Sequence, residues 1–164
     1  MQGFFARVAA AAMLVVAAAA IAQDNGAIET RLEARKVVRG ADGSETFASA
    51  QSAKPGDVIE YVATYRNTTT QPVRNLEATL PIPANTEVVP ESALPATAKA
   101  SVDSVSFAAM PLMRKVMRRG KETDEPVPMR EHRYLRWYLD ELGGGKSALF
   151  SARVKVINEP GGGK

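Results

Sequence analysis

The residues best suited to chemistry in this chain gather in one segment, residues 108–133. It holds four of the six methionines and the only histidine: Met110, Met113, Met117, Met129 and His132. Thioether sulfur and imidazole nitrogen are ligands that suit Cu(I), so one hypothesis is a copper site in a methionine-rich loop. The competing interpretation is that these methionines fill irregular gaps beneath a long loop, which is the commoner role of methionine.

Other catalytic chemistry finds little support in the residue types present. The chain contains no cysteine, which excludes cysteine nucleophiles, disulfides and thiolate metal sites. His132 lies between charged neighbours in the run 130–133, so we expect a solvated loop residue. A general base needs a pocket and an orienting partner. The phosphate-loop, dinucleotide and Gly-x-Ser-x-Gly patterns are absent. We therefore predict no catalytic residue and no cofactor, and a hydrolase ranks only third.

A stripe of aromatic and basic residues is the best candidate for an interaction surface. Tyr134, Arg136 and Tyr138 alternate with apolar residues that include Trp137, so on a strand they share one face. Tyrosine and arginine are enriched at interfaces, and such a face suits a partner protein or a glycan. The alternative is that residues 108–133 cover this face. Unpaired edge strands offer a second route, in which another chain adds a strand.

The charges of the chain argue against nucleic acid as a partner. The sequence has 21 Lys and Arg against 18 Asp and Glu, a formal net charge of +3 over 164 residues. The basic run at 114–121 is short and is followed at once by acidic residues at 122–125. Opposite charges on either side of Gly120 favour a long hairpin whose two arms neutralise each other. A short helical stripe from Ala109 is the alternative, and Pro111 weakens it.

The first 22 residues have the pattern of a secretory signal peptide. Arg7 supplies the positive charge, residues 8–22 are uncharged and largely apolar, and Ala20–Ala22 form a small-x-small cleavage site. The apolar run is too short and too rich in alanine for a retained span, so we expect no stable membrane span in the mature chain. Residues 23–157 then form one domain and 158–164 a flexible tail. Export without cysteine favours a bacterial protein, periplasmic or extracellular.

The strongest structural signal after residue 22 is alternation of apolar and polar residues with period two. No sustained helical stripe is present, and turn residues separate the apolar runs. These patterns predict strands at about 27–38, 45–50, 57–66, 73–80, 86–89, 100–107, 134–139 and 148–157. Short strands with one polar face predict an all-β fold, an immunoglobulin-like antiparallel β-sandwich of about seven strands. Trp137 is the expected core anchor.

Residues 54–157 resemble, in order, the conserved repeat domain of bacterial surface proteins, catalogued as domain of unknown function eleven. The similar segments are Lys54–Tyr61 with Tyr65–Thr68, Leu76–Pro81 with Thr86–Val89 and Glu91–Ser92, and Leu135–Trp137 with Leu142–Ser147 and Phe150–Val156. The chain departs from that pattern at Thr69, where the family often has glycine, and in the longer segment 108–133. The resemblance implies a sandwich used as a spacer or adhesion module. With a single copy here, a role in tandem arrays does not transfer.

Together these patterns predict an exported, non-enzymatic β-sandwich module of the bacterial cell envelope with a structural or protein-interaction role. Its expected partner is an envelope protein or a glycan. The alternative function is a periplasmic Cu(I)-binding protein that uses the methionine-rich segment 108–133.

Overall fold

The structure is a computed structural model that describes residues 26–158. The predicted leader, residues 1–22, and all but the first residue of the predicted tail, 158–164, lie outside these residues. Within the described part of the chain, no helix is long and apolar enough to cross a membrane.

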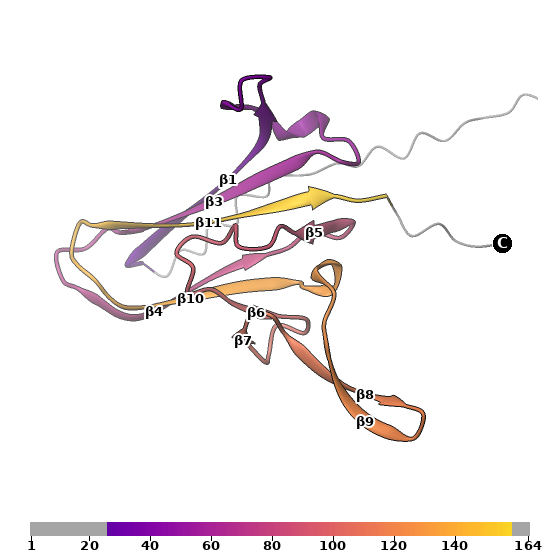
Figure 1. The fold of residues 1–164 in the computed structure, drawn as a ribbon. Helices are drawn as coiled ribbons and strands as arrows, with labels where there is room; N and C mark the ends of the chain where they lie inside the picture. Colours follow the sequence, from indigo (N-terminus) through magenta and orange to yellow (C-terminus); the bar gives the residue numbers. More distant parts are fainter. Residues whose placement is uncertain (1–25, 159–164) are drawn as a thin grey trace, which may run out of the picture.

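Two antiparallel sheets face each other in a sandwich (Figure 1). In spatial order, the first sheet contains β2 (Glu45–Ser49), β1 (Ile28–Arg39), β3 (Val58–Asn67), β11 (Ser147–Val156) and β5 (Thr86–Val88). The second contains β4 (Val73–Pro81), β10 (Tyr134–Leu142), β6 (Lys99–Ser101) and β7 (Ala108–Ala109). A separate pair, β8 (Met113–Arg118) and β9 (Lys121–Pro126), and two short 3₁₀ turns, η1 (Ala50–Ser52) and η2 (Met129–Glu131), complete the described elements. The predicted all-β antiparallel sandwich is confirmed.

The chain passes between the two sheets four times. Two of these crossings, from β3 to β4 and from β10 to β11, lie at the same end of the sandwich. As a result β3 lies beside β11 in one sheet and β4 beside β10 in the other. The last two strands of an immunoglobulin domain share a sheet, whereas β10 and β11 do not. The two crossing loops contact each other, because the Gly145 N–H donates to the Thr69 carbonyl at 2.9 Å.

Asn67 ends β3 as its residue type predicts, since its side chain bonds to nearby backbone. Its carboxamide accepts the Thr69 N–H at 3.0 Å and donates to the Gln71 and Leu142 carbonyls at 2.7 and 3.0 Å. Asn67 is fully buried, so these bonds satisfy a polar side chain that would otherwise be costly to bury.

The core lies between the sheets and is centred on Trp137, which is 1% exposed. Its ring packs against that of Phe150 with centroids 5.3 Å apart. The indole N–H donates to the Pro95 carbonyl at 2.7 Å, which supplies the partner that a buried indole needs. Trp137 is therefore the predicted core anchor, held by both packing and a hydrogen bond.

The expected strand at 100–107 is wrong from residue 102 onward. The chain forms strand only at β6 and β7, and a turn separates them. The Ser101 hydroxyl accepts the Asp103 and Ser104 N–H groups, and the Asp103 carboxylate accepts the Val105 and Ser106 N–H groups. Short polar side chains that bind local backbone in this way compete with a sheet ladder.

The hairpin expected within residues 108–133 is confirmed, and the alternative helical stripe is wrong. β8 and β9 pair from Met113 opposite Pro126 to Arg118 opposite Lys121. The reversal uses Arg119 at φ 52° and Gly120 at φ 77°, a tight left-handed turn that glycine favours.

Candidate functional site

The most distinctive feature of the molecule is the hairpin of β8 and β9, residues 113–126, which we call the arm. It belongs to neither large sheet and extends away from the sandwich (Figure 1). Cross-strand ion pairs join its two strands: the Arg118 guanidinium lies 2.6 Å from the Glu125 carboxylate, and the Lys115 ammonium lies 2.6 Å from Glu122. Arg118 holds the pKa of Glu125 below its ordinary value. The arm is thus a solvent-exposed hairpin whose two strands are joined by ion pairs.

The arm joins the sandwich through a buried segment that we call the root, residues 110–112 and 127–132. Leu112 and Val127 are each 8% exposed, and the Val127 N–H donates to the Leu112 carbonyl at 2.8 Å. An ion pair of 2.6 Å links Arg114 of the arm to Glu131 of the root. The root therefore inserts apolar side chains into the core and fixes where the arm begins.

His132 is buried in the root, and the expectation of a solvated loop residue is wrong. The residue is 0% exposed and directly follows the 3₁₀ turn η2. The Arg133 guanidinium donates to the Arg130 and His132 carbonyls at 2.7 and 3.1 Å, so the charged neighbours stay near the surface. Neither ring nitrogen of His132 makes a hydrogen bond of good geometry among the described residues, although the Val127 backbone interacts with the ring closely enough to act on its pKa.

Burial lowers the pKa of His132 from its ordinary value of 6.5. The Val127 backbone and the Glu131 carboxylate act in the opposite direction but are outweighed. The neutral imidazole is therefore the form that fits the root. Protonation would place a charge with no partner in an apolar setting, which is strongly disfavoured.

The four candidate methionines separate into two pairs. Met110 and Met129 pack against the core, and the Met129 carbonyl accepts the His132 N–H at 3.3 Å. Met113 and Met117 lie on the arm and are 54% and 69% exposed. The structure therefore places Met129 and His132 in the root, joined by a backbone hydrogen bond, and leaves the second pair on the solvent-exposed arm.

The stripe of Tyr134, Arg136 and Tyr138 lies on the outer face of β10. The Arg136 guanidinium stacks over the Phe107 ring at 3.8 Å and contacts Glu77 at 2.9 Å. Tyr138 is 48% exposed, with the Lys99 ammonium 5.1 Å from its ring centroid. Local partners thus engage the centre of the stripe, and the Tyr138 end remains open to solvent.

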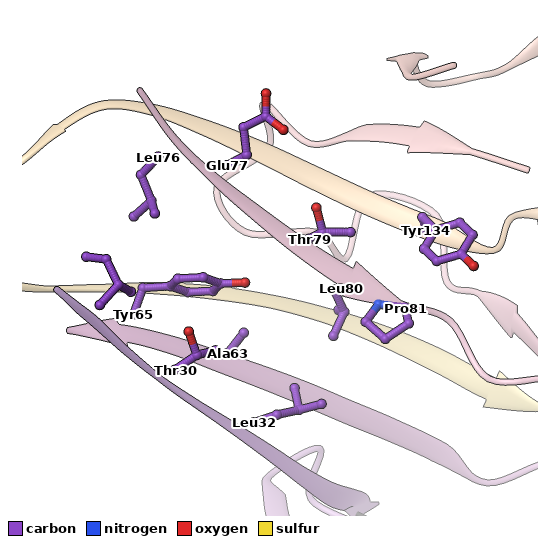
Figure 2. Close-up of a pocket in the computed structure, with 11 residues that line it drawn as sticks. Thr30, Leu32, Ala63, Tyr65, Leu76, Glu77, Thr79, Leu80, Pro81 and Tyr134 are labelled. Atoms are coloured by element: carbon purple, nitrogen blue, oxygen red, sulfur yellow. The ribbon is translucent and has the colours of Figure 1, made fainter. Parts of the chain in front are cut away.

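A groove of about 440 Å³ opens between the sheets along the free edge of β4 (Figure 2). Its apolar walls come mainly from β1, β3 and β4: Ile28, Leu32, Ala63, Tyr65, Leu76 and Leu80. The edge of β4 is poorly suited to strand addition, because Asn75 has φ 54° and Pro81 lacks an N–H. The geometry therefore weighs against this edge as the binding route.

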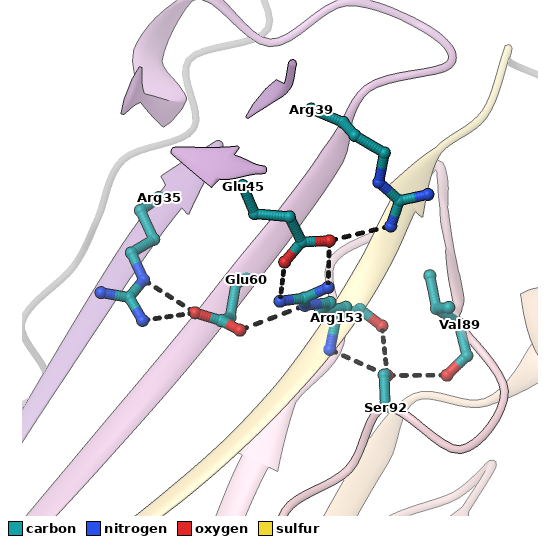
Figure 3. A network of polar contacts seen from close by, with 7 residues as sticks. All are labelled: Arg35, Arg39, Glu45, Glu60, Val89, Ser92 and Arg153. Carbon is teal, nitrogen blue, oxygen red and sulfur yellow. Dashed lines mark hydrogen bonds and ion pairs between the residues drawn. The ribbon is translucent and has the colours of Figure 1, made fainter. Parts of the chain in front are cut away.

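A network of alternating charges crosses the outer face of the first sheet (Figure 3). Arg153 contacts Glu45 at 2.7 Å and Glu60 at 3.1 Å, while Arg39 and Arg35 bind the same two carboxylates at 2.8 and 2.6 Å. Arg153 and then Arg39 lower the pKa of Glu45 to about 2. Both carboxylates are already paired with arginine, so the network suits the joining of β1, β2, β3 and β11 and is poorly suited to proton transfer.

No protein-family model matches the chain, and neither a curated protein nor a solved structure matches it. The geometry of this molecule is therefore the basis on which its function is inferred. The sequence alone pointed to the histidine and the methionines as candidate metal ligands and to the stripe as a candidate interaction surface. It missed the burial of His132 and the projection of the arm, although the opposite charges around Gly120 predicted a hairpin.

Proposed function

We propose that the protein is a non-enzymatic interaction module of the bacterial cell envelope and that the arm is its binding element. One observation carries this proposal: a charged hairpin stands clear of a well-packed sandwich while its root is buried in the core. Binding residues commonly lie on connecting segments that a rigid scaffold positions. The leader pattern at residues 1–22 supports export.

The chemistry of the best-formed polar cluster also favours binding over catalysis. The carboxylates of Glu45 and Glu60 are engaged by arginines, and His132 has no acidic orienting group hydrogen-bonded to it in residues 26–158. A general base needs both access to substrate and an orienting partner. These features support a scaffold that presents a surface.

Site-specific photo-crosslinking in envelope fractions tests the proposal. A photoreactive residue replaces Met117 on the arm, and a matched protein carries it at Lys155, an exposed position of β11. We expect one defined envelope protein to be crosslinked from position 117 and not from position 155. Equal, diffuse labelling from both positions would contradict the proposal.

Cu(I) binding remains a second candidate because of His132. The root holds a buried imidazole whose nitrogens lack well-formed hydrogen bonds and also the Met129 thioether, and these are donor types that Cu(I) accepts. Anaerobic titration with Cu(I) in competition with a chromogenic chelator tests it, with His132→Leu as the matched variant. Sub-micromolar binding that His132→Leu abolishes would support the copper role. The absence of such binding would remove it.

A further inference from the structure

The net charge of the described chain is concentrated in the arm, the root and the adjoining Arg133. Residues 110–133 carry 7 Lys and Arg against 4 Asp and Glu, a net +3. The remaining described residues, 26–109 and 134–158, carry 12 of each sign and are neutral as a group. The scaffold therefore contributes no net formal charge, and the projecting element is cationic.

The uncompensated cations lie at the tip of the arm. Arg118, Arg119 and Lys121 surround Gly120, and only Arg118 has an ion-pair partner within the described chain. Arg119 and Lys121 are both exposed. The left-handed turn at Arg119 and Gly120 places these side chains at the point farthest along the arm from the root. This tip is electrostatically complementary to an acidic group on a partner.

The sides of the arm indicate which kind of acidic partner fits. The register places Met117 opposite Glu122 and Lys115 opposite Asp124, so exposed methionines share a face with two carboxylates. Lys115 on the same face pairs with Glu122, so Asp124 is the carboxylate that would repel a flat anionic bilayer as the methionines approached it. A polypeptide can place its own apolar and charged side chains selectively, and methionine and arginine are both enriched at protein interfaces.

We propose that the arm binds an acidic, extended polypeptide segment of a partner protein through Arg119, Lys121 and the exposed Met117. This inference rests on the proposed function and names the partner class for the same element. The arm already contains one example of such pairing, because β9 supplies an acidic strand along one edge of basic β8. The other edge of β8 is unpaired in the described structure.

Fluorescence anisotropy with a labelled peptide that alternates Glu and Val tests the proposal on the purified protein. The first variant is Arg119→Ser/Lys121→Ser. The matched control is Lys146→Ser/Lys155→Ser, which removes the same charge from exposed positions of the sandwich. We expect the tip variant to bind roughly tenfold more weakly and the control to bind like the original protein. A Lys–Val peptide should not bind, and added salt should weaken the Glu–Val complex.

Several outcomes would overturn the inference. Equal loss in the tip and control variants would mean that only net charge matters. Binding to phosphatidylglycerol vesicles without binding to the Glu–Val peptide would assign the tip to a membrane. If position 117 crosslinks a partner through a segment without acidic residues, the acidic-partner inference fails while the interaction-module function stands.

Discussion

The sandwich and the arm of this protein are stabilised by opposite means. The sandwich buries Trp137, Leu135 and Val154 at 1% exposure or less, and its charges cancel. The arm buries little of itself and is joined by surface ion pairs, which contribute little stability each. An isolated two-stranded hairpin is marginal in water, so the arm depends on its root. The sandwich therefore provides most of the stability of the fold, and the arm provides a binding surface of low local stability.

The largest effect is expected from the core of the sandwich. Trp137→Ala should destabilise the fold by about 3–5 kcal/mol, because it removes a fully packed ring and leaves the Pro95 carbonyl without its donor. Met117→Ser on the arm should change the free energy of unfolding by less than about 0.5 kcal/mol. Chemical denaturation measures both. Similar losses in the two variants would abolish the distinction between the regions.

The next effect concerns the contact of the two crossing loops. A Cβ at Gly144 would lie 2.2 Å from the Thr70 carbonyl oxygen, so Gly144→Ala must displace backbone. We expect a loss of about 2 kcal/mol from this overpacking. Gly143→Ala is the matched control, because its Cβ would meet only the flexible Lys146 side chain at 3.4 Å. Thermal denaturation should separate the two variants by several degrees. Equal midpoints would show that the loops are not rigidly packed.

These two regions also differ in how far the sequence predicts them. Alternation of apolar and polar residues located nearly every strand of the sandwich, because a sheet with one buried face imposes period two directly on the chain. The exception at 100–107 arose where Ser101 and Asp103 bind local backbone. Such bonds depend on the conformation that they help to create, so alternation alone did not reveal them.

For the arm, charge signs around Gly120 predicted the hairpin, yet nothing local predicted that it projects. Whether a hairpin lies on a sheet or leaves it is decided by its root, through contacts such as Leu112 with Val127. The burial of His132 likewise depends on tertiary contacts that the local sequence does not reveal. Its neighbours in sequence are charged, and the Arg133 guanidinium is satisfied by the Arg130 and His132 carbonyls while the imidazole is buried.

His132 makes the junction of the two regions sensitive to pH. Burial in the root lowers the pKa of His132. Above about pH 6.5 the imidazole is therefore neutral in both the folded and the unfolded state, and its titration does not affect stability. As the pH falls below that value, His132 binds a proton in the unfolded state but stays neutral in the folded state. Stability should then decline by up to about 1.4 kcal/mol per pH unit until the folded-state pKa is reached.

His132→Leu is the matched variant for this prediction. It removes the titration and two buried ring nitrogens that lack a well-formed hydrogen bond, so at neutral pH it should be as stable as the original protein or more stable. Its free energy of unfolding should also lose the decline that begins below about pH 6.5. Hydrogen exchange should show the same difference first in the root, around Val127. Parallel pH profiles in both proteins would assign the decline to other groups.

The smallest effect on global stability is expected from the cross-strand ion pairs of the arm. This prediction also separates the arm from the sandwich most clearly. Glu125→Gln removes the carboxylate that Arg118 holds at 2.6 Å and frees a third cation at the tip. Because both groups lie in solvent, the unfolding midpoint should not move measurably. Amide exchange within residues 113–126 should nevertheless quicken, since the pair joins the two strands. Affinity for an acidic peptide should rise, because Arg118 becomes available to it. Loss of that affinity instead would mean that the ion pairs order the tip for binding, and the arm would then act as a preformed surface rather than an adaptable one.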